Sequence, residues 1–333
     1  MKGSRRVSQI GHTLFLCSIK IFNQNRDRKE KRKMELSTST NITAFCPDGK
    51  KNPMTYSIEL CAAAGYRVLD LNFCEAMNPH SRMRDDDWER YVDEIGELGS
   101  RLGVRFTQSH LPYYDIFGTT DEMQIRRMEE LIRRSLVASG RLGVRWAVTH
   151  PGTVYQAGPD MEVSLRENLN YYASHVETAV RHGVGIALEN DFEYRSRPYR
   201  RIYCASVEEL CTLADAFHSN TVGVCYDFGH ANLTGGFHRQ NLNRIGNRLK
   251  AVHVQDNHGM SDEHLMPFFG NIDWEEAMTG LAEIGYAGEL TYEIQEFGRN
   301  VPNELKSHVV DLSLVMGKHL IALYEKALQN KVC

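Results

Sequence analysis

The sequence predicts an α/β fold, a parallel (β/α)8 TIM barrel, on three observations. A short apolar run, a polar loop and an amphipathic helix follow one another eight times after residue 34. A parallel barrel requires eight such units, because each crossover places a helix outside the sheet. Polar side chains also follow many of the strands, and no G-x-G-x-x-G motif follows the first, which disfavours a doubly wound open sheet.

The predicted strands are short, and the later ones consist of β-branched and aliphatic residues, as expected where both faces of a sheet are buried. They cover Leu36–Thr40, Arg67–Asn72, Val104–Ser109, Arg145–Thr149, Gly185–Glu189, Val222–Asp227, Lys250–Val254 and Glu289–Glu293. Each run is too short for an average helix, which favours the strand assignment.

The helices between these strands have recognisable ends. Ser206 and Glu209 have the spacing of a capping box, in which each side chain satisfies a free backbone N–H of the first turn. Asp273 precedes another stretch with helical apolar spacing, and Gly285 follows it where a left-handed cap is expected. We assign the apolar stripes of these helices to core packing and not to chemistry.

One barrel domain, residues 34–333, accounts for most of the chain. The protein has 333 residues, of which 42% are hydrophobic and 25% charged, as is typical of globular proteins. Residues 1–33 are basic, and we expect a disordered extension there. Polar residues interrupt its apolar run and no small-residue cleavage site follows, which disfavours a secretory signal. A natural start at Met34 is a second hypothesis for this region.

The net charge disfavours some classes of binding partner, and the cysteine pattern indicates the redox compartment. A formal net charge of −4 disfavours strong attraction to nucleic acid or to anionic lipid. We also expect no membrane span. The eight cysteines are scattered without a C-x-x-C pair, so we expect free thiols in a reducing compartment, the cytoplasm. The sequence does not decide between a monomer and a homo-oligomer.

Ligand-type side chains end the four last predicted strands: Glu189, Asp227, His253 and Glu293. The carboxyl ends of barrel strands share one edge, so these groups should converge. Unpaired buried carboxylates are costly, and a cation satisfies all of them at once. Three carboxylates and one imidazole suit Mn²⁺, Mg²⁺ or Co²⁺. The sequence therefore predicts a divalent-metal site, with Mn²⁺ as the first expectation and Zn²⁺ as a further candidate.

Further imidazoles and one more carboxylate follow the same rule. His110 and His150 follow the third and fourth strands, and His230 lies three residues beyond Asp227. Asp262 and His264 lie in the loop after strand seven. We expect His110, His150, Asp262 and His264 to bind additional metal or substrate.

The order of these motifs resembles that of the xylose-isomerase-like barrels, a superfamily of sugar-phosphate isomerases and epimerases, ketose 3-epimerases, inosose dehydratases and endonuclease IV. The resemblance covers roughly residues 36–325. It rests on Ser109-His110-Leu111-Pro112, His150-Pro151-Gly152, Leu188-Glu189-Asn190, Asp227-Phe228-Gly229-His230, His253-Val254-Gln255-Asp256-Asn257, Asp262-Glu263-His264-Leu265 and Gly285–Glu293. Together these motifs are specific for the superfamily, but much less so for the reaction.

In the isomerase and epimerase branch, the resemblance implies that Glu189, Asp227, His253 and Glu293 bind one metal. That metal would hold adjacent carbonyl and hydroxyl oxygens of a small sugar, sugar phosphate or polyol and stabilise an enediolate. Glu189 and Glu293 would form the catalytic acid/base pair, and the catalytic His230 would contact a substrate oxygen.

The chain departs from the ketose 3-epimerases at two positions. Gly259 stands where those enzymes carry an arginine, and Arg195 stands where they carry a second glutamate. A ketose 3-epimerase is therefore not favoured, and an inosose-type dehydratase stays open. The arginine group Arg195, Arg197, Arg200 and Arg201 is expected to be a solvated face, with binding of a substrate phosphate or carboxylate as the alternative.

The main rival is a phosphodiesterase similar to endonuclease IV, which acts on abasic DNA with three metals, expected as zinc. Each of its ligand types has a counterpart in this chain. The acidic net charge disfavours this phosphodiesterase, because binding of duplex DNA requires several contacts from Lys or Arg to phosphate. The segments 270–274 and 285–286 also look more like the sugar branch. A third hypothesis is a barrel that serves only as a binding or partner subunit. Such a barrel would be expected to lack a metal-ligand residue, and none is missing from this sequence.

Overall fold

The computed structural model describes residues 33–155, 160–193 and 201–332, and residues 34–333 form one compact unit. The predicted disordered extension lies outside the described residues except for Lys33, so it stays a prediction. Arg195, Arg197 and Arg200 also lie outside them. Among the described residues, no helix combines the length and the hydropathy that a bilayer crossing requires.

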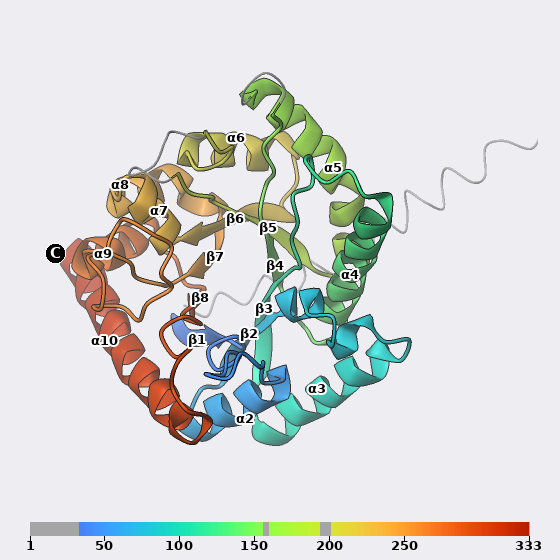
Figure 1. Ribbon diagram of the computed structural model, residues 1–333. Helices are drawn as coiled ribbons and strands as arrows, with labels where there is room; N and C mark the ends of the chain where they lie inside the picture. Colours follow the sequence, from blue (N-terminus) through green and yellow to red (C-terminus); the bar gives the residue numbers. More distant parts are fainter. Residues whose placement is uncertain (1–32, 156–159, 194–200, 333) are drawn as a thin grey trace, which may run out of the picture. The chain divides into compact units, whose positions relative to one another are not determined.

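Eight parallel strands form a barrel, as the sequence predicts, with helices on the outside (Figure 1). The strands are β1 Glu35–Ser39, β2 Val68–Asn72, β3 Arg105–His110, β4 Trp146–Thr149, β5 Gly185–Glu189, β6 Val222–Asp227, β7 Leu249–His253 and β8 Glu289–Tyr292. Every bound lies within one residue of its predicted position.

Each strand pairs with its neighbours in the chain, and the first pairs with the last. The order is β7-β6-β5-β4-β3-β2-β1-β8, with parallel partners throughout. The ring closes between β7 and β8, where Val254 N donates to Thr291 O at 2.8 Å and Glu293 N donates to Val254 O at 3.1 Å. All strand carboxyl ends therefore surround one mouth.

The helices pack around the strands (Figure 1). They are α2 Met54–Ala64, α3 Trp88–Leu102, α4 Glu122–Arg141, α5 Met161–Arg181, α6 Val207–Ala216, α7 Phe228–Thr234, α8 His238–Ile245, α9 Trp274–Ile284 and α10 Lys306–Val332, with 3-10 turns η1 Phe73–Met77, η2 Arg82–Arg84, η3 Gly246–Arg248 and η4 Asn303–Leu305. The large apolar core lies between strands and helices, and a small inner cluster fills the barrel axis.

One of the two predicted helix caps is confirmed. Asp273 accepts the Glu276 N–H at 3.0 Å, and Gly285 ends α9 with a φ of 68°. The capping box of α6 is wrong. The Ser206 hydroxyl donates to the Glu208 carboxylate at 2.6 Å, and Glu209 instead accepts from Cys204 N at 3.1 Å and from Arg201. These carboxylate contacts are charge-assisted and outcompete the neutral cap.

Candidate metal centre

The four predicted ligands Glu189, Asp227, His253 and Glu293 meet at the barrel mouth. One ligand atom from each lies within 4.8 Å of the others, and all four side chains are buried. His253 Nδ1 lies 2.7 Å from Glu189 Oε1 and 3.4 Å from Glu293 Oε2. The alternation of side chains along β5, β6 and β7 directs their last residues into the barrel, which brings these groups together.

Backbone and amide contacts hold Asp227 in place. Its carboxylate begins α7 by accepting the His230 N–H at 2.6 Å, and Gln255 Nε2 donates to the same oxygen at 3.3 Å. Asn190 accepts from Asp227 N at 2.8 Å and donates to Asp227 O at 3.0 Å. Within the described residues, Asp227 Oδ2 and Glu189 Oε2 are buried without a hydrogen-bond donor. Such oxygens fit a cation.

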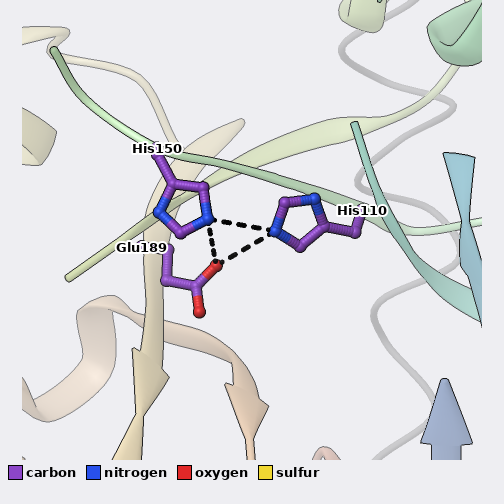
Figure 2. Close-up of side chains that lie close together, drawn as sticks. All are labelled: His110, His150 and Glu189. Atoms are coloured by element: carbon purple, nitrogen blue, oxygen red, sulfur yellow. Dashed lines mark hydrogen bonds and ion pairs between the residues drawn. The ribbon is translucent and has the colours of Figure 1, made fainter. Parts of the chain in front are cut away.

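A second group joins His110 and His150 to the other oxygen of Glu189 (Figure 2). Both Nε2 atoms lie 3.4 Å from Glu189 Oε2 and 3.2 Å from each other. His110 Nδ1 lies 2.8 Å from the Leu111 carbonyl, which can only accept, so the proton is on Nδ1 and Nε2 is left for an ion. Glu189 is therefore shared by two ligand groups.

A third group consists of His230, Asp262 and His264. Asp262 Oδ2 lies 2.8 Å from His264 Nε2 and 3.6 Å from His230 Nε2. His264 Nδ1 bonds to Glu293 O at 2.9 Å, and His230 Nδ1 bonds to Asn190 O at 2.8 Å. Both Nε2 atoms therefore face the carboxylate. The structure thus brings every predicted site residue into one of three adjoining groups.

Burial and close opposite charges shift the pKa values across these groups. Burial raises the pKa of Asp227 to about 7, and it lowers the pKa of His150 to about 3. Burial alone would raise the pKa of Glu189, but the imidazoles of His253 and His150 hold it well below its usual range. Burial likewise opposes the charge on His264, yet Asp262 raises its pKa to about 9. A metal that binds here must displace protons from imidazole.

A pocket of about 830 Å³ opens above the groups. Its lining includes six of the predicted site residues, namely His110, His150, His230, Asp262, His264 and Glu293. Tyr113 flanks it with its ring centroid 5.5 Å from that of His150, and the Phe192 ring lies 4.8 Å from that of His230. The site therefore has a charged floor and aromatic walls.

Asp and Glu side chains outnumber Lys and Arg side chains around this pocket. Among the described residues, Lys51 and Arg82 are its only Lys or Arg lining residues, against five Asp or Glu. Arg82 is paired with Glu94, and its guanidinium stacks 4.6 Å from the Tyr91 ring centroid. Of the arginine group, the described Arg201 pairs with Glu193 at 2.7 Å and with Glu209. The Arg201 guanidinium is therefore neither solvated on a free surface nor available to bind a substrate anion.

Sequence reasoning missed three contributors. Gln255 donates to Asp262 at 2.7 Å as well as to Asp227, and so links two groups. Its place two residues after His253 is a signal that could have found it. The thiol of Cys74 lies 3.2 Å from His110 Nδ1, and nothing local predicts that contact. Asp70 is a charged residue within an apolar strand, which is itself a signal.

The fold and the clustered carboxylates and imidazoles define the class of the protein, a TIM barrel with a candidate metal site at its mouth. The chain belongs to the family of xylose isomerase-like TIM barrels, which matches residues 58–309. The resemblance that the motifs indicate is therefore confirmed.

Similarity to individual proteins is more distant. The chain is 26% identical over 285 residues to the uncharacterized protein MJ1311 of Methanocaldococcus jannaschii, covering 84% of this chain and 90% of that protein. It is 34% identical over 205 residues to the uncharacterized protein y4fM of Sinorhizobium fredii, covering 61% and 63%.

Solved structures of sugar epimerases share the fold. A D-tagatose 3-epimerase-like protein superimposes with a TM-score of 0.67 at 23% identity, covering 90% of this chain and all of that one. An L-ribulose 3-epimerase gives 0.68 at 15% identity, with 90% and 97% covered. The 3-keto-D-glucoside 4-epimerase YcjR from E. coli gives 0.63 at 17% identity, with 86% and 100% covered.

Proposed function

We propose that this chain is a divalent-metal-dependent isomerase or epimerase of a sugar, sugar phosphate or polyol. The observation that carries the proposal is the convergence of Glu189, Asp227, His253 and Glu293 beneath a pocket of about 830 Å³. The family and the sugar epimerases that share its fold support it.

The four converging residues would hold the ion, with Mn²⁺ as the expected metal. Their three carboxylates and one imidazole form a donor set for a hard divalent cation. A bound cation would act as a Lewis acid that stabilises negative charge developing on substrate oxygen.

We assign the proton transfer first to Glu293. It lines the pocket, whereas Glu189 is fully buried below it. Glu293 would take a proton from the substrate carbon, and Glu189 would serve as the second acid/base group of the pair. His230 also lines the pocket, and we assign it to a substrate oxygen. The aromatic rings of Tyr113 and Phe192 would exclude water from the reacting atoms.

The charge of the pocket lining favours a neutral polyol over a phosphodiester. Among the described residues, the lining carries five Asp or Glu side chains against two Lys or Arg, and Arg82 is already paired. Duplex DNA needs several cationic contacts to its phosphates. A sugar, in contrast, presents hydroxyl groups that carboxylates and imidazoles can bind.

One observation favours a second candidate, a phosphodiesterase similar to endonuclease IV. Three ligand groups adjoin, and Glu189 belongs to two of them. A carboxylate shared in this way can bridge two cations, which would activate water and stabilise both oxygens of an in-line displacement. The charge of the pocket lining places this candidate second.

Metal content and substrate turnover separate the candidates. Protein purified without chelator should contain one equivalent of Mn²⁺, Co²⁺ or Mg²⁺, and about three zinc ions would favour the phosphodiesterase. A panel of ketoses, sugar phosphates and inososes in D₂O should give product with deuterium at the epimerised or isomerised carbon. Loss of water from an inosose would assign a dehydratase instead. Cleavage of abasic-site DNA with no turnover of the panel would overturn the proposal.

A further inference from the structure

A carboxylate is buried inside the barrel, below the four-residue metal group. Asp70 stands in β2 between Leu69 and Leu71, whose side chains belong to the outer core, so alternation directs Asp70 inward. Its side chain is fully shielded from solvent. Neither of its oxygens has a hydrogen-bond partner among the described residues. A buried charge of this kind is costly and needs a compensating group.

The imidazole of His253 faces this carboxylate. His253 Nε2 lies 3.9 Å from Asp70 Oδ2. Because β8 and β1 separate β7 from β2, the two side chains can meet only through the barrel interior. The other ring nitrogen, Nδ1, lies 2.7 Å from Glu189 Oε1. His253 therefore stands between Asp70 on one side and the candidate metal ligands on the other.

We propose that Asp70 is a positioning residue for His253, whose carboxylate stabilises the proton on Nε2 and thereby keeps Nδ1 free and directed at a divalent cation. This inference rests on the proposed metal-dependent function. An imidazole binds a metal through a nitrogen without a proton, so the proton must lie on the other nitrogen. A carboxylate beside that proton fixes the tautomer and makes the ring a stronger ligand.

The charge of Asp70 distinguishes it from two other polar groups in the interior. Gln108 pairs with Asp70 in the β2–β3 register, but its amide is neutral. Cys225 has its sulfur within 4.8 Å of ligand atoms of Glu189 and His253. Its thiol is only a weak hydrogen-bond acceptor. At 3.9 Å the attraction between Asp70 and His253 is mainly one of charge.

Mn²⁺ titration of the metal-free protein tests the proposal in Asp70→Asn and Asp70→Ala. Both variants should raise the Kd for Mn²⁺ about 10- to 100-fold, the usual cost of losing such a partner. Either variant should also lower the Tm of the metal-free protein, because removing one member of a buried charged pair is destabilising. The readout that distinguishes a positioning residue is therefore the Kd, since a purely structural residue would lower the Tm and leave the Kd unchanged. Ser37→Ala, which removes a buried unpartnered hydroxyl from β1, should leave the Kd unchanged.

A double-variant cycle with His253→Gln shows whether Asp70 acts through the imidazole. Asp70→Asn should change the Mn²⁺ Kd no further once the ring is gone. An additional tenfold loss in that background would make Asp70 a ligand itself and overturn the proposal, as would an unchanged Kd in Asp70→Ala. Wild-type protein that binds no divalent cation at all would contradict the proposed function and this inference with it.

Discussion

His253 Nδ1 and Glu189 Oε1 lie 2.7 Å apart, although 64 positions separate the two residues in the chain. Each ends a barrel strand, β7 and β5, and both side chains are buried. Such a pair of strand-end ligands is stable only where the surrounding charges are balanced by protons or by a cation.

Glu293→Gln should abolish turnover and leave the fold intact. The amide preserves the shape of the side chain, which lines the pocket, but can neither accept a proton nor bind a cation as strongly. We expect a loss of about 10²- to 10⁴-fold in kcat, the usual contribution of a general acid or base. Glu296→Gln is the matched control, since Glu296 pairs with Arg299 instead. Circular dichroism checks the fold, and an active Glu293→Gln enzyme would remove this residue from the mechanism.

Gly229→Ala should weaken metal binding through Gln255. A methyl group at Gly229 would lie 2.1 Å from Gln255 Cδ, and this buried amide cannot move without losing its bonds to Asp227 and Asp262. Overpacking of this kind costs about 1–3 kcal/mol of stability. Denaturant unfolding and Mn²⁺ titration measure the two effects.

The double variant Gly229→Ala, Gln255→Ala separates the clash from the lost amide. It should recover most of the stability, because the methyl group then has room, but it should not recover the metal affinity. Gly96→Ala in α3, remote from the site, is a control for the substitution itself. Equal free energies of unfolding for Gly229→Ala and wild type would show that the Gln255 side chain moves away from the methyl group without destabilising the protein.

Asp256→Ala should be far more destabilising than Asp273→Ala. The buried Asp256 carboxylate accepts from the backbone N–H groups of Phe268 and Ile272 and from Trp274 Nε1, at 2.9, 3.2 and 2.9 Å. Leaving these buried donors without an acceptor should lower the free energy of unfolding by about 3–5 kcal/mol, whereas loss of the Asp273 cap should lower it by about 1 kcal/mol. Urea unfolding followed by Trp fluorescence measures both. Similar losses in the two variants would contradict this ranking.

The strands and the convergence of the four strand-end side chains could be predicted from sequence because local patterns determine them. Most of the strands are apolar runs, and the position of Glu189 or Asp227 at a strand end determines that the side chain faces the barrel mouth. Contacts between distant elements carry no such local signal. The pairing of Asp70 with His253 depends on the barrel closing. The capping box fails because the Ser206 hydroxyl bonds to Glu208, while Arg201 and the Cys204 N–H bind Glu209.

The buried His238 should make the protein less stable below about pH 6.5. Burial lowers the pKa of His238 to about 4, and its Nδ1 lies 3.1 Å from the Tyr226 hydroxyl. In the unfolded chain, an ordinary histidine binds a proton near pH 6.5. The unfolded state therefore binds more protons than the folded state between pH 6.5 and 4. Stability is fully present above that window and falls as the pH drops through it, by on the order of 3 kcal/mol.

His238→Asn isolates this contribution, because the asparagine Oδ1 can accept the tyrosine hydrogen bond but cannot titrate. Denaturant unfolding at pH 7.5 and pH 4.5 should show a smaller loss of stability for the variant than for the wild type, although the variant starts lower through lost packing. Asn241→Ala serves as the control, since it removes the other hydrogen bond to the Tyr226 hydroxyl, at 3.2 Å, without removing a titratable group, so its pH dependence should match that of the wild type. Parallel stability curves for wild type and His238→Asn would mean that folding does not shift the pKa of His238.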